Sequence, residues 1–316
     1  MLDAIRFVQG AVAKKDFVPA LTHFRIENGH IRGYNGMLGL CSPIDVDLNS
    51  SPRAIPFVKA IQTCQETIQL HMTPTGKLAI RSGPFKVHID CALGNFPDME
   101  PEGKEIPLVN PLLPALRLLF PFIAEDASRP WARGILFRGN SAYATNNILL
   151  IEHWLGSPFP VEINVPKMAV IELLRIGEEP THLQVSETSI AFHYPHGRWL
   201  RTQSYSLAWP ELGLIMNRPN EQESVPETLW TAVEALAPFT DDLGRIHLLE
   251  GSISTETATE NGAIMEVPGI RAGGCFNFKQ LLLLKGVAIT VDFSTFPKPC
   301  IFYGEKLRGA IVGMRG

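Results

Sequence analysis

The sequence predicts an α+β protein made of three tandem domains, each with two copies of a unit in which strands follow one helix. Three observations predict this fold. Prolines typical of helix starts recur 110 residues apart, at Pro56 and Pro166, and every predicted helix is followed by segments that alternate like strands. The junctions around Phe96 and Trp209, which each join an aromatic residue to proline and an acid, lie 113 residues apart. Such repeats cover each other's apolar faces, which predicts an extended or closed array.

Six helices are predicted from apolar residues at helical spacing, such as Leu112 and Leu116. The first is expected to begin at the N-terminus. Pro56 and Pro166 are each expected at the first position of a helix, and Asn277 is expected to cap the last helix. The predicted helices span residues 1–15, 53–65, 111–123, 166–176, 227–239 and 277–286.

Strands are predicted after each helix, where apolar and polar residues alternate. The stretch ARGILFRGNSAYATNNILLIEHWL, from Ala132 to Leu155, contains two or three strands in quick succession. Asn28-Gly29 and Asn261-Gly262 are typical hairpin turns. These elements predict three domains, at residues 1–107, 108–222 and 223–316.

Composition narrows the class of protein. The chain has 316 residues, 45% of them hydrophobic, and no apolar run approaches the ~20 residues that cross a membrane. The N-terminal segment lacks the basic leader and cleavage site of a signal peptide, so a cytoplasmic location is expected. The five cysteines have no CxxC or Cys/His ligand spacing, which favours reduced, buried thiols over a disulfide or a metal site.

Five segments resemble motifs of one known family. GILF at residues 134–137 and ATNNILL at residues 144–150 resemble the GxLF segment and the ATDGHRLA turn of the β sliding clamp of bacterial DNA polymerase III. VPKMAVIELLR is similar to the helix of type VPRKGVIELMR, FNFKQLLLLKG to FNxxYLLDAL, and the C-terminal AIVGMRG to VVMPMRL. Because the motifs keep their order and spacing over three repeats, the chain is identified as a compact, diverged member of this family, of a kind that suits a phage.

The resemblance implies a specific architecture and function. Each domain would be a DNA-clamp domain, with the helices lining a ring and the sheets outside. A head-to-tail homodimer would close this ring around double-stranded DNA without reading its sequence. Short linear peptides of the replicative polymerase and of the clamp loader would dock in a pocket between domains 2 and 3. The resemblance implies no cofactor, no contact with a membrane and no enzymatic activity.

The charge distribution can be compared with this expectation. The predicted helices contain ten Lys or Arg and four acids, a net charge of +6, whereas the remainder carries −10, for a total of −4. Cationic helices around a bore would attract phosphates without reading bases. The alternative is that Lys and Arg simply favour exposed helical positions. The predicted DNA-binding residues are Arg6, Lys14, Lys15, Arg53, Lys59, Arg117, Lys167, Arg175, Lys279 and Lys285.

The resemblance also maps a peptide-binding pocket onto this chain. It is expected to be an apolar slot for leucine or phenylalanine anchors, with ordinary interdomain core as the alternative. The charged turn of the family is replaced by Asn146-Asn147-Ile148-Leu149, and the penultimate proline by Gly313, so binding of host-type peptides is in question. The predicted pocket residues are Thr145, Asn147, Ile148, Leu149, Leu150, Pro210, Leu214, Ile215, Ala310, Val312, Met314 and Arg315.

Other function classes compete with the clamp. A clamp-like decoy or regulator would keep the fold without serving a polymerase, and the altered turn favours this alternative. A β-rich structural protein of a virion would show no dependence on DNA. An enzyme is least supported, because the sequence has no glycine-rich phosphate loop, no GxSxG and no HExxH.

Overall fold

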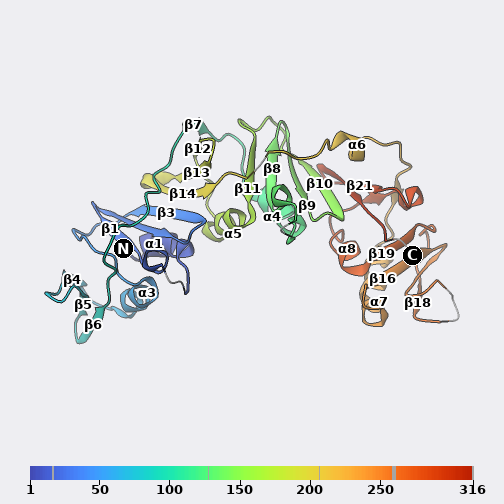
Figure 1. The fold of residues 1–316 in the computed structure, drawn as a ribbon. Coiled ribbons are helices and arrows are strands. Elements are labelled where there is room, and N and C mark those ends of the chain that lie inside the picture. Colours follow the sequence, from blue (N-terminus) through green and yellow to red (C-terminus); the bar gives the residue numbers. More distant parts are fainter. Residues whose placement is uncertain (16–17, 127, 206, 258–260, 315–316) are drawn as a thin grey trace. The chain divides into compact units, whose positions relative to one another are not determined.

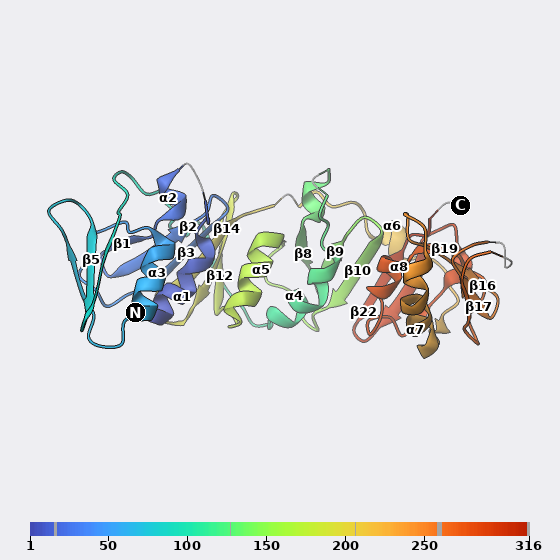
Figure 2. The same ribbon diagram turned by 90° about the horizontal axis from the view of Figure 1, so that it is seen from below.

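The computed structural model describes residues 1–15, 18–126, 128–205, 207–257 and 261–314. The chain forms two compact units (Figures 1 and 2). Unit 1 comprises Met1–Leu113 and Met168–Ser204, and unit 2 comprises Pro114–Lys167 and Tyr205–Gly316. The α+β fold class predicted from the sequence is confirmed, and the division into three domains stays a prediction.

Strands from the first two predicted domains form one antiparallel sheet in unit 1. Its order is β1-β2-β3-β14-β13-β12-β7, and the pairing of β3 with β14 sets Leu40 opposite Leu200. Inward side chains such as Ile31 and Phe192 are fully buried, because this face of the sheet carries the core. The strands are β1 (Arg25–Glu27), β2 (His30–Tyr34), β3 (Leu38–Pro43), β7 (Lys104–Pro107), β12 (His182–Val185), β13 (Ser189–Tyr194) and β14 (Arg198–Gln203).

A second, smaller sheet completes unit 1. It contains β4 (Gln69–Met72), β5 (Leu78–Ser82) and β6 (Phe85–Ile89). Helix α1 packs on β3 and lies beside α3 (Figure 2). The α-helices that contribute to this unit are α1 (Leu2–Val8), α2 (Pro19–Thr22), α3 (Ala54–Thr63) and α5 (Lys167–Ile176), whose first residue is assigned to unit 2.

Unit 2 is built around an eight-stranded antiparallel sheet, in the order β11-β8-β9-β10-β22-β21-β20-β15. Here β10 pairs with β22, so that Leu150 lies opposite Ala310, 160 positions later in the sequence. The strands are β8 (Gly134–Arg138), β9 (Ser141–Thr145), β10 (Leu149–Trp154), β11 (Ile163–Pro166), β15 (Glu223–Ser224), β20 (Thr290–Val291), β21 (Cys300–Gly304) and β22 (Leu307–Ile311).

A four-stranded sheet and four helices complete unit 2. The sheet order is β18-β17-β16-β19, with β16 (Arg245–Leu249), β17 (Ser252–Ser254), β18 (Ile264–Glu266) and β19 (Gly274–Asn277). Helices α7 and α8 lie side by side. The helices are α4 (Leu113–Leu119), whose first residue is assigned to unit 1, α6 (Gly213–Met216), α7 (Glu227–Leu236) and α8 (Phe278–Leu282).

The predicted helix positions are close, but several ends are wrong. The first helix stops after a 3-10 turn, Gln9–Ala11, and Val12 is extended, so Lys14 and Lys15 lie outside it. Lys285 likewise follows the end of α8, and α4 gives way to a 3-10 turn at Phe120–Phe122. Helix ends depend on tertiary contacts that apolar spacing does not encode.

The capping predictions have mixed outcomes. Pro56 is the third residue of α3, whose N-cap is Arg53, and Pro166 ends β11 just before α5. Proline is tolerated at these places because amides of the first helical turn have no intrahelical partner. The Asn277 cap is confirmed, since its Oδ1 accepts hydrogen bonds from the amides of Lys279 at 2.9 Å and Gln280 at 3.3 Å.

The two hairpin predictions also differ in outcome. Asn28 and Gly29, at φ 52° and 70°, form the two-residue turn between β1 and β2. Gly262, at φ 76°, instead belongs to a longer connection between β17 and β18 that includes residues 258–260, outside the described part of the chain. The strands pair as expected, but the connection is not a two-residue turn.

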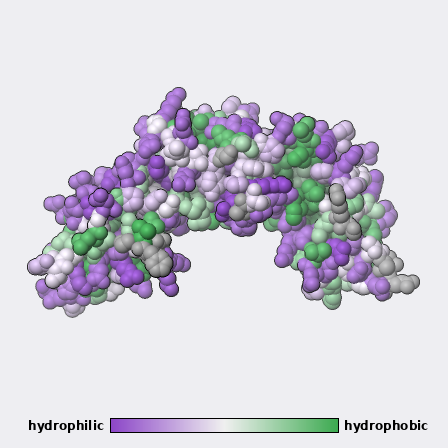
Figure 3. Space-filling view, in the orientation of Figure 1, coloured by the Kyte–Doolittle hydropathy of each residue, from purple (hydrophilic) through white to green (hydrophobic). Residues whose placement is uncertain are grey.

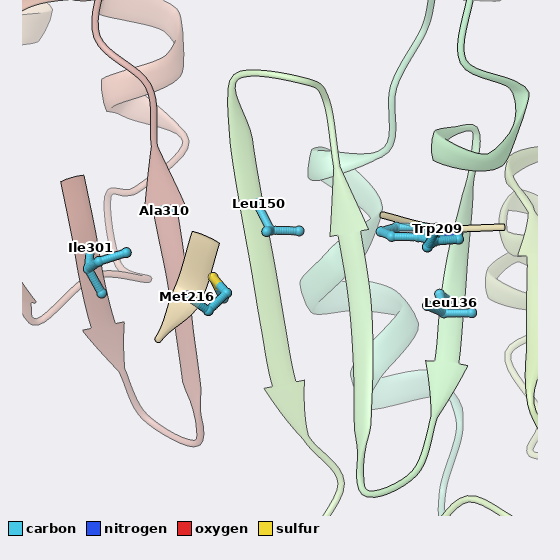
Figure 4. Packing of buried hydrophobic residues seen from close by; sticks show 6 residues of the cluster. All are labelled: Leu136, Leu150, Trp209, Met216, Ile301 and Ala310. Atoms are coloured by element: carbon cyan, nitrogen blue, oxygen red, sulfur yellow. The ribbon is translucent and has the colours of Figure 1, made fainter. Parts of the chain in front are cut away.

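The interior of unit 2 contains an apolar cluster that crosses from β8 to β21. Figure 4 shows Trp209 beside Leu136 of β8 and Met216 near β22. Within the described ranges, no helix combines the length and apolar character that crossing a bilayer requires. The cluster consists of Leu136, Leu150, Trp209, Met216, Ile301 and Ala310.

Candidate functional site

An apolar pocket of about 120 Å³ lies where β10 and β22 meet in unit 2. Figure 3 shows apolar surface (green) on unit 2 in the region where Figure 1 places α6, β10 and α8. Exposed apolar side chains of this kind mark binding surfaces when they gather around a concavity. The pocket is lined by Arg129, Trp131, Thr145, Asn147, Ile148, Leu149, Leu150, Pro210, Leu212, Ile215, Pro299, Ala310 and Val312.

The turn between β9 and β10 forms one wall and is held by its own side chains. Thr145 Oγ1 donates to the Leu149 carbonyl at 2.7 Å and accepts from the Asn147 amide at 3.1 Å. Asn146 Oδ1 accepts from the amides of Ile148 at 3.0 Å and Leu149 at 2.8 Å. Asn147 adopts φ 75°, which asparagine tolerates better than most residues. The turn therefore presents Ile148, 39% exposed, without any charge.

Two polar contacts tie this turn to its surroundings. Arg129 Nη1 donates to Asn147 Oδ1 at 3.2 Å, which places a guanidinium at the pocket's edge. Asn146 Nδ2 donates to Gln280 Oε1 on α8 at 2.7 Å. The turn is thus held from two sides, by Arg129 before β8 and by Gln280 on α8, before any ligand binds.

The opposite wall is the C-terminal strand. The Val312 amide donates to the Ile148 carbonyl at 2.9 Å, which continues the β10–β22 ladder past the end of β22. Val312 is 43% exposed and Ala310 is buried. Two strands far apart in the sequence therefore bring small and branched apolar side chains together.

Aromatic residues support the pocket from below. The rings of Trp131 and Trp209 pack with centroids 4.9 Å apart, and Leu212 and Ile215 pack against the same cluster. A tilted aromatic pair of this kind stabilises the site beyond the area it buries. The floor is therefore rigid and apolar, and suits aliphatic or aromatic anchors.

An ion pair between a buried carboxylate and a partly exposed arginine joins the two strands beside the pocket. Glu152 of β10, 5% exposed, accepts from Arg308 Nε of β22 at 2.6 Å and from Ser141 Oγ at 2.8 Å. Burial alone would raise the pKa of the Glu152 carboxyl, but hydrogen bonds from Arg308, Ser141 and Tyr143 outweigh this, and the pKa lies below its usual value. The pair thus stabilises the fold at neutral pH and loses this contribution as the pH falls through the folded-state pKa.

The structure brings together most of the residues that were mapped to the pocket. Nine of the twelve line it. Leu214 does not, and it lies on α6 with 73% of its surface exposed. Met314 pairs instead with Cys275 in an isolated bridge, and Arg315 lies outside the described residues. The pocket role of all twelve stays a prediction.

Sequence reasoning missed four lining residues: Arg129, Trp131, Leu212 and Pro299. Trp131 stands three residues before the GILF motif. A tryptophan beside a motif could have indicated the site from the sequence, because tryptophan is enriched among residues that dominate binding. Pro299 carries no such signal, because only the pairing of β21 with β22 brings it to the site.

The ten predicted DNA-binding cations fall into two groups. Four of them form ion pairs: Arg6 with Asp3, Lys167 with Glu125, Arg175 with Glu172, and Lys285 with Glu234. The other six make no ion pair within the described residues: Lys14, Lys15, Arg53, Lys59, Arg117 and Lys279. All six are exposed, which leaves their charges available to a ligand.

Arg175 has a structural task in unit 1. Its Nη1 donates to the Arg6 carbonyl at 3.0 Å and its Nη2 to the Phe7 carbonyl at 2.8 Å, at the end of α1. A cation there satisfies carbonyls that have no intrahelical partner. Its partner Glu172 is 4% exposed. This guanidinium is therefore largely committed to the fold, and it contributes less to any ligand than its sequence position suggests.

Among the described residues, no three or more His, Cys, Asp or Glu side chains gather as a possible metal site. The five cysteines are free thiols. Burial raises the pKa of Cys41 and of Cys300, each to about 11, so neither is a thiolate at neutral pH.

No protein-family model matches the sequence, and a search of curated proteins found no match. Solved structures, in contrast, match the fold over the whole chain. The β sliding clamp of Caulobacter crescentus, with polyethylene glycol bound at a β-motif tethering region, has a TM-score of 0.83 and 19% identity. The Bacillus subtilis clamp has a TM-score of 0.80 and 16% identity. A Bartonella birtlesii clamp bound to griselimycin has a TM-score of 0.81 and 16% identity. Each match covers 100% of this chain and 97% of the other.

Identities of 16% to 19% show a shared fold and carry no residue-level assignment. The fold of this chain is that of the DNA polymerase III β sliding clamps.

Proposed function

We propose that this protein is a DNA sliding clamp, a processivity factor that encircles duplex DNA and tethers a replicative polymerase. The observation that carries the proposal is the match of the whole chain to solved clamps, rather than of one domain. A clamp holds DNA by enclosure, so it needs a complete ring and no catalytic group. In this proposal the protein has no enzymatic activity and acts in the cytoplasm.

The ring would be a head-to-tail homodimer. The strands β4, β6 and β18 are sheet edges with no further strand paired to them among the described residues. Unpaired edges are an aggregation hazard unless a partner covers them, and a contact that closes after two copies would do so. The solution mass is accordingly expected to be about twice the 34.9 kDa of one chain.

The apolar pocket of unit 2 would receive short linear peptides of the polymerase and of the clamp loader. Its rigid tryptophan floor and branched walls suit leucine and phenylalanine anchors. A single small pocket that binds several peptides in turn would let different proteins use one ring. Opening of the ring would be the work of a separate, ATP-driven loader.

If the protein encircles DNA, it should remain on circular DNA and be lost from linear DNA. Protein loaded on a nicked circular plasmid and then moved to about 0.5 M salt, where phosphate contacts are screened, is expected to stay bound. Cutting the circle once should release it, because a ring slides off a free end. The measurement is the bound fraction by gel filtration before and after cutting. Equal loss from circles and linear DNA would refute enclosure, and a decoy or structural protein would behave in this way.

A second prediction concerns the unpaired cations. Reversing the charge of Lys14, Arg117 and Lys279 together is expected to weaken binding at low salt and to lower the slope of log K against log [salt]. Each lost phosphate contact changes this slope by ~0.9. Lys104→Glu on the edge strand β7, which lies outside the predicted helices, is the control and should leave the slope unchanged. An unaltered slope in the triple variant would show that these residues do not face DNA.

A further inference from the structure

A second hollow of unit 2 adjoins the apolar pocket, and its charged side chains are cations. It is open, with a volume of about 900 Å³, and its wall is formed by Arg218, Pro219, Ser294–Pro299 and Ile301. Pro299 lines both hollows, and Ile301 belongs to the apolar cluster under the first. The two hollows therefore adjoin at Pro299, so residues that flank an anchor in the first lie within reach of the second.

Among the described residues of its wall, Arg218 and Lys298 are the only ones with a charged side chain. Neither forms an ion pair within the described part of the chain, in which thirteen other Lys or Arg residues do. Arg218 Nε donates to the Leu214 carbonyl at 3.1 Å, which orients the guanidinium. Two unpaired cations in one concavity raise the local concentration of anions.

The nearby carboxylate does not neutralise these charges at the wall. Asp292 is 3% exposed, and its oxygens accept from the Glu221 amide at 2.8 Å and from the Ser294 amide and hydroxyl at 3.1 Å and 2.6 Å. These hydrogen bonds hold the Asp292 carboxylate inside the fold, where it fixes the backbone at Ser294. The Ser294 hydroxyl is committed to this carboxylate, so the donors left for a ligand are those of Arg218 and Lys298.

The wall of the hollow is fixed before any ligand arrives. The Phe296 ring packs so closely on Gly313 and Gly274 that a Cβ at these positions would lie 2.5 Å and 2.3 Å from it. Phe276 packs edge-on to the same ring, with centroids 6.1 Å apart. Three prolines, Pro219, Pro297 and Pro299, line the hollow and offer no backbone donor. Such a surface suits an extended peptide whose side chains, and not its backbone, make the polar contacts.

We propose that this hollow binds acidic side chains that flank the apolar anchor of the docking peptide, and that Arg218 and Lys298 select such partners. This inference rests on the proposed docking of peptides in the first pocket, and it adds the charge of the preferred partner. The β9–β10 turn has no charged residue of its own, and the one cation beside it, Arg129, is hydrogen-bonded to Asn147. Arg218 and Lys298 are the cations of the second hollow, and exchanging only these two residues separates their effect from that of Arg129.

The test uses three fluorescein-labelled peptides with the same leucine and phenylalanine anchor. One has three aspartates before the anchor, one has three after it, and one has serines on both sides. Fluorescence anisotropy on the full-length protein at low salt is expected to show about fivefold tighter binding of one acidic peptide than of the serine peptide, as two partly exposed ion pairs would give. The preference should vanish at about 0.5 M salt.

Variants assign the effect to the hollow. Arg218→Glu combined with Lys298→Glu should abolish or invert the preference while the serine peptide binds as before. Lys306→Glu, a single charge reversal in the β21–β22 turn and outside both hollows, should retain it. Equal binding of acidic and serine peptides to the unchanged protein would overturn the inference alone, whereas no binding of any peptide would overturn the proposed function with it. Displacement of the acidic peptide by a short DNA duplex, lost in the double variant, would assign the hollow to phosphates and also overturn the inference.

Discussion

Val312→Asp is expected to weaken binding of an anchor peptide about 100-fold without unfolding the protein. The side chain is 43% exposed and lines the pocket beside Ile148, so the free protein tolerates a carboxylate there. In the complex this carboxylate would be buried against an apolar anchor, which costs roughly 3 kcal/mol. Anisotropy titration of the serine-flanked peptide measures the change.

Leu214→Asp is the matched control for this variant. Leu214 was assigned to the pocket from the sequence, yet the structure leaves it 73% exposed and outside the lining. The same aspartate there should change the peptide affinity by less than about twofold, since exposed polar substitutions lose little. If both variants weaken binding equally, the peptide lies over α6, and the pocket at the β10–β22 junction is not its site.

The second large effect is on stability. Gly309→Ala is expected to lower the free energy of unfolding by about 3 kcal/mol or more, because an added Cβ would lie 2.1 Å from the Phe302 ring and 2.5 Å from the Leu150 carbonyl oxygen. Gly309 stands opposite both Ile151 of β10 and Phe302 of β21. The Leu150 carbonyl is backbone and cannot move without opening the ladder. Thermal and urea unfolding followed by circular dichroism measure the loss.

Gly213→Ala is the control for the glycine substitution. Gly213 begins α6 in the same unit, and the atom nearest to an added Cβ is the side-chain Nδ2 of Asn217 at 3.2 Å, not a backbone atom. Alanine also favours helix, so stability should be unchanged or slightly raised. A Gly309→Ala protein as stable as the unchanged chain would mean that β10 and β22 do not pair as described.

Local signals in the sequence predicted much of the fold. The Asn277 cap and the Asn28-Gly29 turn depend on neighbours within three residues, and both are confirmed. The first helix was drawn too long because apolar spacing continues to Val12, whereas the chain there becomes extended. Lys14 and Lys15 were thereby placed on a helix that ends before them.

The lining of the pocket could be predicted from the sequence only in part. Thr145 and Ile148 were found because they belong to a contiguous turn whose side chains fold it locally. Arg129 and Pro299 were missed, and Leu214 was included, because membership depends on which side chain faces the concavity. A shift of one residue between paired strands turns every side chain to the other face, and one sequence does not state the register.

By itself, the sequence determined the alternation of helices and strands, the α+β class and the uncharged turn between β9 and β10, because each of these follows from interactions within a few residues. Only the tertiary structure decided that Leu150 meets Ala310, that Arg175 serves the end of α1, and that Arg218 and Lys298 share one hollow. These juxtapositions join positions from about eighty to about 170 residues apart, and they arise when strands pair and bury a common core.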